Sequence, residues 1–226
     1  MSHCSAFSGG KFAASGIMNA VKVWGLAMLI QEYGPISAEE YLHLDARSPT
    51  RHEYVGGEIF ALASGTLRHN VISGNVAVTL RGHLRDTPCP VFINDVKLRV
   101  AKANAYYYPD ILVSCGHDAQ AMDLASGEVN DAVLIIEVLS PGTEAIDRRE
   151  KLLAYRTLPS LAEYTLISQD QVRVEIHRRR GDFGWEKVEY SGDEIVELAS
   201  VKLKISMRDI FEGVPMESLR RGPGAV

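Results

Sequence analysis

The chain has 226 residues, of which 46% are hydrophobic and 23% are charged, and its formal net charge is −5. A chain of this length and composition can bury its own core, so neither a disordered protein nor a small disulfide-stapled scaffold is indicated. The negative charge argues against a protein that coats DNA non-specifically, but it does not exclude an enzyme that contacts DNA through one local patch.

Residues 1–35 are expected to form an extension that lies outside the folded domain. Residues 16–30 are mostly apolar, but they are shorter than the roughly 20 residues of a membrane span and carry Lys22. No signal-peptide cleavage pattern follows them. The three cysteines, at positions 4, 89 and 115, are far apart in sequence and form no CxxC pattern. We therefore expect no membrane span, no disulfide framework and a cytoplasmic location.

The domain itself is expected to span residues 36–213, with a loose tail at 214–226. Ser37 and Glu40 form a capping box, which predicts a short helix directly after it. Gly56-Gly57 lies between two short strand-like segments and predicts a hairpin. A longer helix is expected to begin at Thr66 and to end before the break at residues 86–90.

The second half of the domain is expected to contain most of the strands. Residues 91–100 alternate as one strand, which would place Asp95 and Lys97 on the same face. Residues 132–139 form a nearly continuous apolar run, the pattern of a strand buried on both faces. The remaining expected elements are strands at 109–113, 163–168, 172–178, 185–190 and 201–205, and helices at 144–157 and 207–212. This order predicts an α/β fold in which a mixed β-sheet is flanked by helices.

Glu137 is the most informative residue because it interrupts the apolar run. An isolated buried carboxylate is costly, so Glu137 must be paired with a buried cation, protonated or bound to a metal. Asp110 begins the preceding apolar strand, 27 residues earlier. Two carboxylates on adjacent strands can converge on one Mg²⁺, which typically takes one or two carboxylates together with waters and phosphate oxygens.

Each of several further charged residues allows two interpretations, a solvated position or a position in the site. Asp95 and Lys97 could form a solvated strand face or approach the site, and Glu58, at the start of the second hairpin strand, is equally ambiguous. On the helix after Glu137, four residues share one stripe, which is either solvent-facing or directed at the cation site. These four are Glu144, Asp147, Lys151 and Tyr155.

Five segments in this order resemble the Uma-two restriction-endonuclease family, part of the PD-(D/E)XK nuclease superfamily. They are RHEYVGGEIF, RHN, NDVKLRV, YYYPDILV and IIEVLSPGTEAIDRREKLLAYRTLPSLAEYTLI. The resemblance covers residues 36–210 and implies a restriction-endonuclease-like core. It implies that Asp110 and Glu137 are the PD and (D/E)XK acids that bind Mg²⁺ or Mn²⁺, and that Glu58 is a further acidic site residue.

The sequence departs from the superfamily pattern at Leu139, where the usual lysine is absent. We expect Lys151 to replace it, with Lys97 as the second candidate and Asp95 as a further metal ligand. The predicted function is a metal-dependent endonuclease acting on DNA, in a form compatible with a homodimer. The alternatives are a non-catalytic nuclease-fold module that binds nucleic acid or protein, and a metal enzyme acting on a small phosphate ester.

Overall fold

The computed structural model describes residues 35–62, 65–116 and 127–215, and the predicted extension at 1–35 therefore lies almost entirely outside the described residues. The centre of the fold is a six-stranded sheet in the order β11-β10-β9-β8-β6-β3. Only the β8–β9 pair is parallel, so the sheet is mixed, as predicted. Its strands are β3 (Val91–Ile93), β6 (Ile111–Val113), β8 (Leu134–Leu139), β9 (Glu163–Ser168), β10 (Arg173–Arg179) and β11 (Trp185–Ser191).

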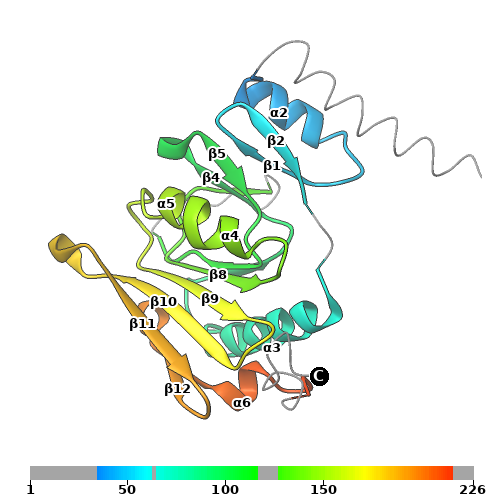
Figure 1. The fold of residues 1–226 in the computed structure, drawn as a ribbon. Coiled ribbons are helices and arrows are strands. Elements are labelled where there is room, and N and C mark those ends of the chain that lie inside the picture. Colours follow the sequence, from blue (N-terminus) through cyan, green and yellow to red (C-terminus); the bar gives the residue numbers. More distant parts are fainter. Residues whose placement is uncertain (1–34, 63–64, 117–126, 216–226) are drawn as a thin grey trace, which may run out of the picture.

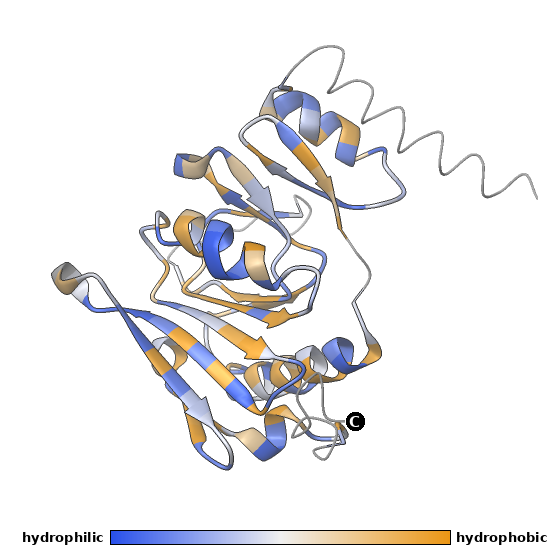
Figure 2. Cartoon of the chain, viewed as in Figure 1, coloured by the Kyte–Doolittle hydropathy of each residue, from blue (hydrophilic) through white to orange (hydrophobic). Residues whose placement is uncertain are grey.

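Strand β8 is buried along its whole length. All six of its residues are buried, between β6 on one side and β9 on the other. Figure 2 shows β8 largely in the colour of hydrophobic residues, whereas β10 alternates between the two colours. The continuous apolar run in the sequence thus correctly predicted a central strand, and Glu137 is the only charged residue within it.

One face of the central sheet is covered by helix α3 (Leu67–His83), which begins after its N-cap Thr66 as predicted. Helix α6 (Met207–Ile210) and a two-stranded sheet pack into the same hydrophobic core. That small sheet consists of β12 (Ile195–Leu198) and β13 (Leu203–Ser206). Short 3-10 turns lie at η1 (Ala101–Ala103), η4 (Gly181–Phe183) and η5 (Ala199–Val201).

The opposite face is covered by the helical segment that connects β8 to β9 (Figure 1). The single helix expected at 144–157 is a composite of α4 (Glu144–Ile146), a π-helical turn η3 (Asp147–Lys151) and α5 (Leu152–Tyr155). π-Helical turns within α-helices occur frequently at functional sites. In this chain the turn begins and ends with the two buried residues Asp147 and Lys151.

A second sheet has the strand order β2-β1-β5-β4-β7. It consists of β1 (His52–Val55), β2 (Glu58–Ala61), β4 (Lys97–Val100), β5 (Ala105–Tyr107) and β7 (Glu128–Val129). Helix α2 (Ala38–Asp45) packs on it through Tyr41, and the predicted capping box is present. The predicted hairpin is also confirmed, because Gly56 and Gly57 both adopt the positive φ that a tight turn of this kind requires.

The strand predicted at 91–100 is wrong in one respect, because it is two strands in two sheets. The chain turns at Asn94, which has a left-handed φ of 56°, and the Asp95 amide donates to the carbonyl of Ile93 at 2.6 Å. Asn-Asp is a common turn pair because both side chains tolerate or support such conformations. Asp95 and Lys97 therefore do not share the face of one strand.

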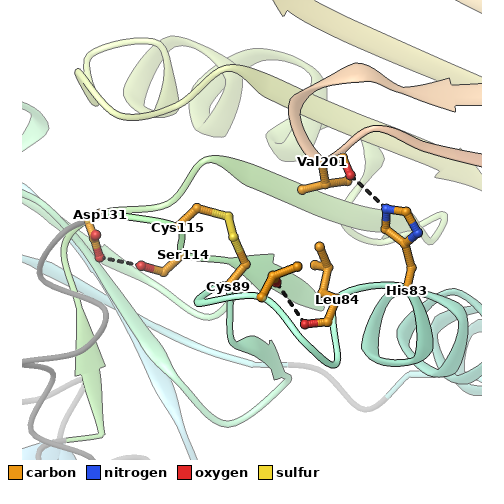
Figure 3. Close-up of a disulfide and its surroundings, with 8 residues drawn as sticks. His83, Leu84, Cys89, Ser114, Cys115, Asp131 and Val201 are labelled. Carbon is orange, nitrogen blue, oxygen red and sulfur yellow. Dashed lines mark hydrogen bonds between the residues drawn. A yellow bond between two sulfur atoms is a disulfide. The ribbon is translucent and has the colours of Figure 1, made fainter.

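The cysteine expectation also needs correction, because Cys89 and Cys115 form a disulfide (Figure 3). They are far apart in sequence, but they lie opposite one another just beyond the β3–β6 pairing, in which Val91 faces Val113. The neighbouring Ser114 hydroxyl donates to Asp131 at 2.8 Å. The pairing of two distant strands, which spacing along the chain does not reveal, brings these cysteines together.

Candidate active-site cleft

A cleft of about 760 Å³ opens where the two larger sheets meet. Its base includes Asp110 and Glu137, and η3 contributes Asp147 and Lys151. The remaining walls come from the loop before β1, the start of α3, the turn at 94–95 and the segment after β8. None of the helices in the described ranges combines the length and the apolar character needed to cross a membrane.

Asp110 and Glu137 lie side by side in the cleft, as predicted. Asp110 directly precedes β6, and the antiparallel register that pairs Ile111 with Ile136 places it opposite Glu137. The Val138 amide donates to Asp110 Oδ2 at 2.7 Å, and the Asp110 amide lies 3.4 Å from Glu137 Oε2. The edge of β6 and β8 therefore fixes both carboxylates relative to the backbone.

Lys151 reaches these carboxylates from η3, and its side chain is only 6% exposed. Its Nζ lies 3.2 Å from Glu137 Oε1, 3.0 Å from Glu53 Oε1 and 3.3 Å from Asp147 Oδ1. The reading in which this helix stripe faces solvent is therefore wrong for Lys151 and Asp147. A lysine does accompany Glu137, and it comes from the following helix.

The electrostatics of this group are dominated by burial and by an excess of carboxylates. Burial raises the pKa of Glu137 well above its ordinary value; Lys151 opposes the shift, and the neighbouring carboxylates reinforce it. Burial alone would lower the pKa of Lys151, but Glu137, Glu53 and Asp147 together raise it well above its ordinary value. The lysine is therefore held as a cation, whereas the buried glutamate takes up a proton more readily than an ordinary carboxylate when no further cation is bound.

Four further residues belong to this site, and of these the sequence had indicated Asp147 and Tyr155, as members of the helix stripe after Glu137. Glu53 on β1 is buried, accepts from the Tyr108 amide at 3.2 Å and pairs with Lys151. His69 Nε2 lies 2.9 Å from Asp110 Oδ2, and this contact is the main cause that raises the pKa of His69. The other two are Asp147 and Tyr155, whose hydroxyl donates to Glu137 Oε1 at 3.1 Å.

Three predicted site residues lie apart from this group. Glu58 is exposed, faces Val55 across the hairpin turn and does not line the cleft; Glu53 occupies the site in its place. Asp95 lines the cleft rim, with a side chain that is 70% exposed, and pairs with Arg51. Lys97 pairs with Asp45 at 2.9 Å instead of approaching Glu137, because β4 belongs to the other sheet.

The donor set can be compared with the needs of a metal ion. Within the described ranges, no three His, Cys, Asp or Glu side chains are arranged as a ready-made metal site. Mg²⁺, however, needs only one or two carboxylates, and Asp110 and Glu137 supply hard oxygen ligands of the kind it prefers. Asp147 Oδ1 is buried, and it lies 3.3 Å from Lys151 Nζ without the geometry of a hydrogen bond. The oxygen-rich donor set thus fits a hard divalent cation.

Comparison with known proteins identifies the family. A family model described as Uma2, "Putative restriction endonuclease", matches residues 38–208. The chain belongs to the Uma2 family. Two proteins of Synechocystis sp. (strain ATCC 27184 / PCC 6803 / Kazusa) are similar to this Uma2 chain, each with 31% identity. They are "Uncharacterized protein slr1290", aligned over 79% of this chain and 93% of its own length, and "Uncharacterized protein sll1609", aligned over 74% and 95%.

A solved structure shares the Uma2 fold. It is described as a "putative nuclease belonging to DUF820 from Anabaena variabilis ATCC 29413". The TM-score is 0.66 at 19% sequence identity, and the match covers 78% of this chain and 98% of that one. The predicted fold class, an α/β core with a mixed sheet between helices, is confirmed by this likeness and by the strand order.

Proposed function

We propose that this Uma2 protein is a metal-dependent endonuclease that hydrolyses phosphodiester bonds in DNA. The observation that carries the proposal is the charge imbalance at the base of the cleft. Four carboxylates, those of Glu53, Asp110, Glu137 and Asp147, are grouped with Lys151 and the imidazole of His69, so the carboxylates outnumber these two bases. Buried carboxylates in such excess require a further positive charge, and a divalent cation would supply it.

Asp110 and Glu137 are the residues that we propose hold Mg²⁺ or Mn²⁺. Their carboxylates are adjacent and both line the cleft. A bound divalent cation supplies Lewis acidity toward a phosphate oxygen and lowers the pKa of a bound water. The family membership and the nuclease description of the structural relative support this assignment.

Lys151 is the residue that we propose replaces the missing strand lysine. Its ammonium contacts Glu137 Oε1, so it lies at the same carboxylate that would bind the metal. A fixed positive charge at this position can stabilise the negative charge that develops on the phosphate. His69 holds the other carboxylate through the hydrogen bond to Asp110 Oδ2, which leaves Asp110 oriented toward the cleft.

The test is the conversion of supercoiled plasmid to nicked or linear DNA with Mg²⁺ or Mn²⁺, and its inhibition by EDTA. Glu137→Gln removes a ligand charge while keeping the shape, and we expect it to abolish cleavage. The matched control is Glu58→Gln, because Glu58 is exposed and lies outside the cleft. We expect this control to cleave like the unaltered protein. Equal trace activity in all three proteins would indicate a contaminating nuclease and reject the proposal.

A non-catalytic nuclease-fold module remains the second candidate, and one observation favours it. Lys151 already contacts three of the four carboxylates, so a single residue supplies part of the missing positive charge. Binding of Mn²⁺ measured by electron paramagnetic resonance separates the two candidates, because the module has no need of the ion.

A cytoplasmic location and a homodimer stay predictions from the sequence, and light scattering in solution would test the dimer.

A further inference from the structure

A second ionic group lies at the exposed rim of the cleft, in the pair formed by Arg51 and Asp95. Arg51 comes from the loop before β1, whereas Asp95 lies in the turn between β3 and β4. Arg51 Nη2 lies 2.7 Å from Asp95 Oδ1, and both residues line the cleft. We call these two residues the rim pair.

Arg51 differs from the other cationic residues that line the cleft in the described ranges. Lys151 is buried and already contacts three carboxylates, and His69 is bound to Asp110. The Arg51 side chain is 48% exposed. A guanidinium presents several donors in a planar fork that matches phosphate oxygens as well as it matches a carboxylate.

The position of the Arg51 guanidinium does not depend on Asp95 alone. Its Nη1 donates to the carbonyl of Asn94 at 3.3 Å, and its central carbon lies 6.0 Å from the centre of the Tyr108 ring. Asn94 presents this carbonyl from the left-handed turn that separates β3 from β4. Two contacts would therefore keep the guanidinium at the rim if the Asp95 carboxylate moved away.

The Asp95 carboxylate can separate from the Arg51 guanidinium at little cost in stability. Its side chain is 70% exposed, and ion pairs between exposed groups contribute little to stability. Its carboxylate also adds to the negative charge of a cleft that must admit a polyanion. We propose that Arg51 is a phosphate-binding residue of this cleft and that the Asp95 carboxylate occupies its guanidinium until DNA enters. This inference rests on the proposed function, because it assumes DNA as the ligand.

Binding of a short fluorescein-labelled DNA duplex, followed by fluorescence anisotropy over a range of salt concentrations, tests this inference without relying on cleavage. The measurement is made in Ca²⁺ and in metal-free buffer. We expect Arg51→Gln to weaken binding by about tenfold, the loss typical of one charge-assisted contact. The slope of log K against log salt should become shallower by about 0.9, the contribution of one phosphate contact. Arg51→Lys keeps the charge but loses the fork, and should give an intermediate affinity.

Asp95→Asn should have the opposite effect and strengthen binding by up to about fivefold, because it removes the competing carboxylate. In the double variant with Arg51→Gln most of this gain should disappear, because Asp95 acts mainly through Arg51. A gain that persists in full in the double variant would mean that Asp95 merely repels DNA, and would overturn the competition.

The matched controls are Arg180→Gln and Glu186→Gln. Arg180 and Glu186 also form an exposed ion pair, but they flank the turn between β10 and β11, far from the β1–β2 hairpin (Figure 1). Arg180→Gln changes the net charge by the same amount as Arg51→Gln, and Glu186→Gln by the same amount as Asp95→Asn. Both controls should leave the affinity for DNA within about twofold, because distant exposed charges are screened. Thermal melts of each variant establish that it is folded.

The possible outcomes separate this inference from the proposed function. If the unaltered protein binds the duplex and Arg51→Gln binds equally well, the inference about the rim pair fails and the proposed function stands. If the folded, unaltered protein binds no duplex at low salt with or without Ca²⁺, both fail.

Discussion

Two ionic clusters, each around a buried charged residue, lie on the two sides of the π-helical turn η3, and they have opposite compositions. The carboxylate-rich cluster in the cleft combines Lys151 and His69 with the carboxylates of Glu53, Asp110, Glu137 and Asp147. The cation-rich cluster surrounds Glu175 of β10 with Arg148, Arg173 and Lys187, and with the imidazole of His177, whose pKa is lowered by burial. Asp147 and Arg148 are consecutive residues, yet each belongs to a different cluster.

The cation-rich cluster is complete as it stands. Glu175 is buried, and its carboxylate oxygens lie 2.9 Å from Arg148 Nη1 and 2.7 Å from His177 Nε2. Burial would raise the pKa of Glu175, but Arg148 and His177 together lower it below its ordinary value. In the carboxylate-rich cluster, by contrast, the pKa of Glu137 is raised.

This difference distinguishes a structural ion cluster from a candidate site. A buried carboxylate with several cations around it is stabilised in its charged form and needs no ligand. A lysine surrounded by several carboxylates leaves negative charge that only protons or a cation can neutralise. Family membership alone does not make this distinction, because it says nothing of the balance of charge in this chain.

The largest expected effect on the free energy of unfolding comes from replacing Lys151, and replacing Arg148 of the other cluster gives the comparison. Lys151→Met leaves buried carboxylates without a partner, so we expect a loss of about 3–5 kcal/mol in the free energy of unfolding. For a chain of this size the melting temperature should fall by about 10 °C. Arg148→Met should cost only about 1 kcal/mol, because Arg173 and Lys187 still lie 3.8 Å from Glu175.

Activity separates the two candidate lysines in the same experiment. At a temperature where both variants are folded, Lys151→Met should reduce DNA cleavage by about 10²–10³-fold. Lys97→Met should keep it, because Lys97 pairs with Asp45 and not with Glu137. Full activity in Lys151→Met together with an inactive Lys97→Met would reverse this assignment.

The next effect concerns the free energy of unfolding, measured by chemical denaturation in EDTA. Neutralising Glu175 should lower it, whereas neutralising Glu137 should not. Glu175→Gln removes the carboxylate that His177 contacts at 2.7 Å and should cost about 1–3 kcal/mol. Glu137→Gln should leave stability unchanged or slightly raised, because it removes negative charge from a cluster with an excess of it. A comparable loss in both variants would mean that the two clusters are equivalent.

A smaller effect is expected in the pH dependence of stability. Because the pKa of Glu175 is lowered in the folded protein, its contribution is fully present above its ordinary value of 4.5. This contribution is lost as the pH falls through the lower, folded value. Melting temperatures between neutral and acidic pH should therefore fall less steeply for Glu175→Gln than for the unaltered protein. Parallel curves would show that Glu175 keeps an ordinary pKa.

The smallest effect concerns the exposed partner of Arg148. Glu144 pairs with Arg148 at 2.8 Å one helical turn away, and its side chain is 51% exposed. Glu144→Gln should cost only a few tenths of a kcal/mol, as is typical of such pairs on helix surfaces. A loss as large as that of Glu175→Gln would show that burial is not what separates strong from weak pairs here.

Much of the fold and part of the site could be predicted from the sequence because their signals are local. The capping box, the Gly-Gly turn and the apolar run around Glu137 each lie within a few residues. Asp110 and Glu137 could be predicted as site residues because Asp110 begins one apolar strand and Glu137 interrupts another. Lys151 could be proposed because its spacing from Asp147 is a helical one.

The remaining site residues depend on contacts between distant segments. Glu53 and Glu58 flank the same hairpin turn, and only the packing of β1 between β2 and β5 shows that Glu53 is the buried one. Lys97 pairs with Asp45 because helix α2 packs on the second sheet, which contains β4. The turn at Asn94 was detectable in principle, since Asn-Asp is a turn signal, but the alternation on both sides of it obscured the break.

The disulfide between Cys89 and Cys115 closes a covalent ring of the chain from residue 89 to residue 115. The ring contains β3, β4, β5 and β6, together with Asp95 and Asp110. A protease that cuts the backbone once inside this ring leaves a single molecule of unchanged mass, apart from one added water. The two fragments separate on a gel only after a thiol reductant has opened the bond, so the nicked and intact forms of the oxidised chain look alike without it.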